Sequence, residues 1–79
     1  MITVLRAYGL RVVIYSYDHE PPHVHVIGDG VAKVLLVGSD GLPEIVYAKD
    51  MNRAEQRRVL KAVREAQLEL LEYWRHIHG

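Results

Sequence analysis

The chain has 79 residues, enough for one domain, and its ten basic and ten acidic side chains give a formal net charge of zero. Balanced charge gives no compositional support for nucleic-acid binding, which usually comes with a surplus of Lys and Arg, although a local basic surface remains compatible with it. The absence of cysteine excludes disulfides and thiolate metal sites. No apolar run approaches a membrane span, no signal peptide is recognisable, and the lack of cysteine is compatible with a reducing cytosol.

The first two thirds of the chain predict an antiparallel sheet. Short β-prone runs are separated by turn residues such as Gly9 and the segment 28–30, a pattern typical of hairpin-connected strands. Pro21 and Pro22 cannot donate ladder hydrogen bonds, so they predict a loop before the third strand. The predicted strands cover residues 2–8, 10–17, 23–27, 31–37 and 42–48.

After residue 52 the apolar side chains recur at steps of three and four, which predicts a helix. Asn52 and Glu55 have the spacing of a capping box, and no Gly or Pro follows until Gly79. We therefore predict one helix over residues 53–78, about 39 Å long. It should pack on one face of the sheet to give a single α+β domain over residues 1–79. Since this helix exceeds the width of the sheet, its last turns should overhang or contact another chain.

The segment 18–26 has the highest density of reactive side chains in the chain. They are Asp18, His19, Glu20, His23 and His25. Histidine titrates near working pH and is the commonest metal ligand. Residues two apart on a strand share a face, so His23 and His25 should project together, about 6–7 Å apart. We expect them to face outward, with Val24 and Val26 facing inward.

These side chains are compatible with three kinds of function. They could supply acid–base or phosphate-contacting groups, a rigid recognition edge for a protein partner, or part of a metal site. We expect no metal and no cofactor, because the segment offers three ligands at most and the sequence supplies no fourth at diagnostic spacing. The candidate catalytic residues are His23 and His25, assisted by His19, Asp18 and Glu20.

A row of cations follows one line of the predicted helix. Its members are Arg53, Arg57, Lys61 and Arg64, with Arg58 beside them. Such a row could contact a phosphate backbone and is our candidate nucleic-acid surface. The simpler interpretation is an ordinary solvated face, because Glu65 and Glu69 are close enough to neutralise it.

The end of the predicted helix supplies candidates for an interface. Leu71, Tyr73 and Trp74 are apolar or aromatic and lie where the helix should extend past the sheet. A small core and a zero net charge favour self-association or an obligate partner. We therefore expect a homodimer or a hetero-complex.

Several of these segments resemble a known family. They are Thr3-Val4-Leu5-Arg6, the segment 18–26, the pair Arg57-Arg58 and the ending Leu70-Leu71-Glu72-Tyr73-Trp74. Over nearly the whole chain they are similar to the small bacterial proteins grouped as domain of unknown function 4160. The resemblance marks Glu20, Pro21, Pro22, His23 and His25 as family signature, with Asp18 and His19 as its further candidates, without assigning a reaction. It also implies a cytoplasmic bacterial protein with a small protein partner encoded nearby, in an arrangement like that of toxin–antitoxin pairs.

On this basis we predict a toxin–antitoxin-like module that acts through its histidine segment, with RNA as a further target. The first alternative is a non-enzymatic protein-binding or regulatory module that dimerises. A metal-dependent enzyme is the less favoured alternative. Whether the protein is an enzyme, and whether it is toxin or antitoxin, stays open from the sequence.

Overall fold

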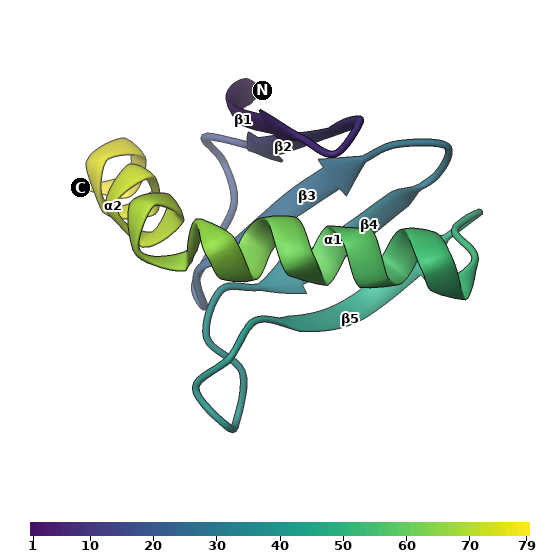
Figure 1. Ribbon diagram of the computed structural model, residues 1–79. Coiled ribbons are helices and arrows are strands. Elements are labelled where there is room, and N and C mark those ends of the chain that lie inside the picture. The colour runs from purple at the N-terminus through teal and green to yellow at the C-terminus, as the bar shows by residue number, and fades with distance from the viewer.

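The computed structural model describes all residues from 1 to 79. One antiparallel sheet contains five strands in chain order, β1 (Ile2–Ala7), β2 (Leu10–Ile14), β3 (His23–Ile27), β4 (Val31–Leu35) and β5 (Glu44–Lys49). Two helices follow, α1 (Arg53–Glu65) and α2 (Gln67–His78). Figure 1 shows α1 lying across one face of the sheet and α2 turned away from it. The predicted α+β class with an antiparallel sheet is confirmed.

One face of the sheet packs against the helices and forms the core. Its fully buried side chains include Val12, Ile14, Val24, Val26 and Val34 from the strands and Val59, Val63 and Leu70 from the helices. Adjacent residues of a strand point to opposite faces. His23 and His25 therefore lie on the face of β3 that is turned away from α1.

The strand β2 ends at Ile14, three residues before the predicted end at residue 17. The chain turns there because the backbone and side chain of Asp18 both bond to Tyr15. The N–H of Asp18 donates to the Tyr15 carbonyl at 3.0 Å, and Asp18 Oδ2 accepts the Tyr15 N–H at 3.1 Å. This local turn starts the loop that leads to β3.

The prediction of one helix over 53–78 is wrong, because the chain leaves helical geometry at Ala66 (φ −116°, ψ 18°). Gln67 Nε2 donates to the carbonyls of Leu36 at 2.7 Å and Gly41 at 3.0 Å, which ties the start of α2 to the β4–β5 connection. A straight helix of about 39 Å would exceed the longest extent of the molecule, 34 Å. The bend instead buries Leu70 and Trp74 against the end of the sheet.

The start of α1 is held at the opposite end of the sheet. Asn52 caps the helix as predicted, its Oδ1 accepting the N–H of Glu55 at 2.8 Å. The Glu55 carboxylate does not close the predicted capping box but accepts the N–H of Asp29, in the β3–β4 turn, at 2.8 Å. This part-buried contact fixes α1 over the sheet. Neither helix has the length and apolar character of a membrane-spanning segment.

Candidate functional site

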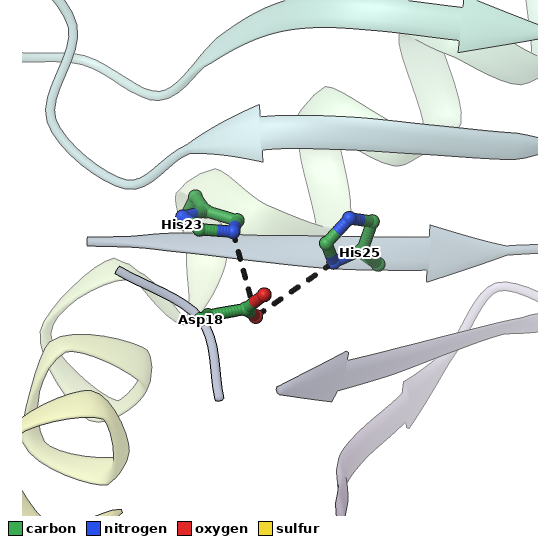
Figure 2. A group of neighbouring side chains, drawn as sticks. All are labelled: Asp18, His23 and His25. Atoms are coloured by element: carbon green, nitrogen blue, oxygen red, sulfur yellow. Dashed lines mark ion pairs between the residues drawn. The ribbon is translucent and has the colours of Figure 1, made fainter. Parts of the chain in front are cut away.

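Asp18, His23 and His25 form one cluster where the β2–β3 loop meets β3, and Figure 2 shows both rings beside the carboxylate. His23 Nε2 lies 3.4 Å and His25 Nδ1 lies 4.0 Å from the same oxygen, Asp18 Oδ2. The two ring centroids are 5.4 Å apart. The structure thus places the two imidazoles together, as the alternation of a strand predicts, and adds the carboxylate that lies between them.

His23 is buried, with 5% of its surface exposed, so the prediction that it faces solvent is wrong. The loop and α2 cover it. His23 Nδ1 lies 3.0 Å from the Pro21 carbonyl oxygen, and its ring centroid lies 5.2 Å from that of Trp74. A carbonyl oxygen can only accept, so Nδ1 carries the proton. In neutral His23 the unprotonated nitrogen is therefore Nε2, which faces Asp18.

His25 gives the cluster its access to solvent, because 23% of its side chain is exposed. Its Nδ1 is nevertheless buried and has no hydrogen-bond partner. Burial lowers the pKa of His25 below its ordinary value, and the nearby positive charge of Lys33 and the ring of His23 lower it further, whereas Asp18 acts in the opposite direction. The edge of the ring contacts Tyr15 at a centroid separation of 4.9 Å.

The cluster concentrates acceptor atoms in a small volume. With neutral imidazoles, the lone pair of His23 Nε2 points toward a carboxylate oxygen, while His25 Nδ1 has no donor to bond. Such atoms repel one another unless a positive charge lies among them. A proton or a metal ion can supply that charge, so the cluster is suited to holding a cation.

The structure does not bring the other predicted catalytic residues into the cluster. His19 and Glu20 are both exposed. Glu20 instead accepts the indole N–H of Trp74 at 2.7 Å and thereby fastens the loop to α2. Trp74, predicted at an interface, is 3% exposed and belongs to the core. Leu71 is half-buried and packs against that core, while Tyr73 is exposed.

The predicted cation row lies on the outer side of α1. All five of its residues, Arg53, Arg57, Arg58, Lys61 and Arg64, are exposed. Tyr8 engages part of this row, since its carbonyl accepts from Arg58 at 3.0 Å and its ring lies 4.8 Å from Lys61 Nζ. The Tyr8 hydroxyl donates to Glu65. Because α1 and the cluster lie on opposite faces of the sheet, the structure does not bring this row and the histidines together.

A second set of cations, which the sequence analysis missed, shares a face with the cluster. Residues paired across strands lie on one face, and two such rows cross the sheet. They consist of Arg6, Arg11, Ile27, Val31 and Lys49, and of Thr3, Val13, His25, Lys33 and Tyr47. We call these two rows the open face. All permanently charged side chains in it are cations, and only the strand register reveals that they are neighbours.

The fold and the cluster define a small α+β protein with a histidine–carboxylate site beside a cationic sheet face. A family model described as a domain of unknown function, DUF4160, matches residues 9–75. The chain therefore belongs to the DUF4160 family. No curated protein matches it, and neither does any solved structure.

Proposed function

We propose that this protein binds single-stranded RNA on the open face of its sheet, as one member of a toxin–antitoxin-like pair. The observation that carries the proposal is the composition of the open face, in which cations lie among aromatic and apolar side chains beside the cluster. The pairing with a small protein encoded nearby rests on the resemblance described above.

The cations of the open face are available to phosphates. Both ion pairs of the structure join Asp18 to a histidine, so no carboxylate lies within ion-pair distance of Arg11, Lys33 or Lys49; the α1 cations form no ion pair either. A neighbouring row does end in an acidic residue, Glu44, which pairs with Leu35 at the edge of the sheet. Contacts between cations and phosphates supply most of the sequence-independent affinity for nucleic acids.

Aromatic side chains near these cations favour a single strand over a duplex. Tyr47 belongs to the open face and is 51% exposed, and Tyr17, next to the cluster, is 72% exposed. Unpaired bases stack on such rings, whereas the bases of a duplex are already stacked on one another. At the other end of the sheet, a hollow of about 650 Å³ is lined by residues that include Arg6, Arg11, Ile27 and Asp29.

Single-stranded RNA bound along the open face would pass over the cluster, because His25 belongs to that face. His25 pairs with Val13 on one side and with Lys33 on the other, so it is near the middle of its row. Because its ring is partly exposed, a nucleotide held between Lys33 and Tyr17 would contact it. This would bring the cluster within reach of the RNA backbone.

The test is the affinity for a short fluorescein-labelled oligouridine, measured by anisotropy. We expect the double variant Lys33→Glu/Lys49→Glu to bind about 10–100-fold more weakly than the wild type. The matched control Arg53→Glu/Arg57→Glu makes the same charge change on α1 and should alter the affinity less than about twofold. The reverse ranking, or a wild type without micromolar affinity, would contradict the proposal. Tighter binding of polyglutamate than of RNA would indicate an acidic protein segment instead.

A protein partner is the second candidate, favoured by the edge of the sheet at β5. Val37, Leu42 and Val46 lie on or near this edge and are 47%, 47% and 46% exposed. An unpaired edge strand with exposed apolar side chains is a common site for pairing with another chain. Co-expression with the product of the neighbouring gene should give a complex that Val46→Lys weakens. Sedimentation of the chain alone tests the predicted homodimer.

A further inference from the structure

We propose that Asp18, His23 and His25 bind one divalent transition-metal ion, with zinc as the type case, through Oδ2, Nε2 and Nδ1. This inference goes beyond RNA binding and does not depend on it, because the metal alone is the probe. It also reverses the expectation from the sequence. That expectation relied on a missing fourth ligand, but zinc sites with three protein ligands leave the fourth position to water or a substrate.

The chemistry of His23 favours a metal ligand. Its Nδ1 donates to the Pro21 carbonyl, which leaves Nε2 as the nitrogen with a free lone pair. Metal-bound histidines almost always donate their other N–H to a carbonyl or carboxylate in this way, because the bond fixes the tautomer and the ring orientation. The ring is held further by its contact with Trp74. The lone pair is thus oriented toward Asp18 before any ion binds.

His25 provides the independent observation. Its Nδ1 is closed to solvent and has no hydrogen-bond partner, which is costly for a polar atom in a folded protein. A proton on His23 Nε2 would let this atom donate to Asp18. His25 Nδ1, 4.0 Å from Asp18 Oδ2, would still have no partner. An ion shared by all three residues satisfies every one of these atoms.

The distances fit a metal site after small movements. One donor atom from each of the three residues lies within 4.8 Å of the others. Ligands about 2.0–2.1 Å from a tetrahedral ion lie about 3.4 Å from one another. The separation of His23 Nε2 and Asp18 Oδ2 is already 3.4 Å, and that of His25 Nδ1 and the same oxygen is 4.0 Å. A modest rotation of the His25 ring would close the difference.

Other side chains support the three ligands and leave one side open. Tyr15 holds the Asp18 carboxylate through its N–H, while the exposed His19 lies outside the group of donors. The partly exposed His25 ring is the side from which an ion would enter and a further ligand would bind. This arrangement is typical of a metal that acts on a substrate rather than one that only stabilises the fold.

The test uses the full chain, purified without a histidine tag and stripped with a chelator. Zn²⁺ binding is measured by titration calorimetry, and Co²⁺ serves as a spectroscopic probe of tetrahedral coordination. We expect one ion per chain and a rise in melting temperature on adding Zn²⁺. Asp18→Asn and His25→Ala should each weaken Zn²⁺ binding at least tenfold. Even the loss of a residue that only supports a metal ligand lowers affinity by about that factor.

Two matched controls separate this site from adventitious histidine binding. His19→Ala removes the exposed histidine next to Asp18, and His76→Ala removes a histidine from the last turn of α2. Both variants should bind Zn²⁺ as the wild type does. Far-UV circular dichroism of stripped Asp18→Asn and His25→Ala should match the wild type, so that lost binding is not lost folding. The proposal fails if the folded wild type binds no stoichiometric ion at micromolar Zn²⁺. It also fails if His19→Ala weakens binding as much as His25→Ala.

Discussion

The outer side of α1 and the open face of the sheet both carry cations, but the two surfaces differ in their surroundings. On α1, Tyr8 contacts Arg58 and Lys61, and its hydroxyl donates to Glu65. On the open face, cations such as Lys33 have no carboxylate partner and lie beside His25. The difference teaches that a row of charges is informative only together with its neighbours. Tyr8 engages two of the five α1 cations, but none of the five forms an ion pair, so the two surfaces differ in the side chains around their cations rather than in ion pairing.

Of the substitutions considered, the loss of Trp74 should have the largest effect on stability, because this side chain holds the loop of the cluster against α2. Its indole packs in the core, contacts His23 and donates to Glu20. We expect Trp74→Ala to lower the free energy of unfolding by about 3–5 kcal/mol, measured by urea denaturation. Arg57→Ala, on α1, should change it by less than about 0.5 kcal/mol. A similar small cost for both variants would mean that α2 does not hold the loop against β3.

The salt dependence of RNA binding sharpens the comparison between the two cation sets. Replacing a residue that contacts phosphate reduces the slope of log K against log salt by about one. We expect this change for Lys33→Ala, together with a loss of about tenfold in affinity at low salt. Arg57→Ala should leave the slope unaltered. An equal reduction by both variants would place the RNA across both surfaces.

Gln67 is the side chain that anchors the bend at Ala66, where α1 ends and α2 begins. Gln67→Ala removes hydrogen bonds to the carbonyls of Leu36 and Gly41. Because one of these bonds is exposed, we expect a loss of about 1 kcal/mol in unfolding free energy. Hydrogen exchange should show faster opening of α2 than of α1. Uniform opening of both helices would indicate that they behave as one.

The pKa of His25 should show the smallest but most specific effect. In protein stripped of metal with a chelator, NMR titration should give a pKa for His25 below the ordinary value of about 6.5, because burial disfavours the charged ring. Asp18→Asn should lower this pKa further, while Lys33→Met should raise it, since the two charges act in opposite directions. Unchanged values in both variants would contradict the placement of His25.

The sign of the accompanying stability change follows from linkage. A histidine whose folded pKa lies below 6.5 binds protons more readily when the chain is unfolded. The contribution of His25 to stability is therefore present at neutral pH. It decreases as the pH falls below 6.5 toward the lower folded value.

Local patterns predicted much of this fold. Alternation in β3 predicted that Val24 and Val26 enter the core and that His23 and His25 share the other face. Periodicity predicted the helical region and its cap at Asn52. The break at Ala66 could not be predicted, because no Gly or Pro marks it. It depends on carbonyls that Gln67 reaches only in the folded chain.

The candidate site was also predicted only in part, because some of its contacts join residues that are far apart in the chain. The histidine pair lies within one strand, so its geometry follows from spacing alone. The burial of His23 depends on Trp74, 51 positions further along the chain, and the open face combines residues from all five strands. Contacts of that range are set by strand register and helix packing, which a single sequence does not display.

Mapping amide chemical shifts of the labelled protein during titration with single-stranded oligouridine tests the central claim most directly. If the open face is the working surface, the largest shifts will fall on His25, Lys33 and Tyr47, with little change along α1. Shifts concentrated between Arg53 and Arg64, with the open face unaffected, would contradict the account.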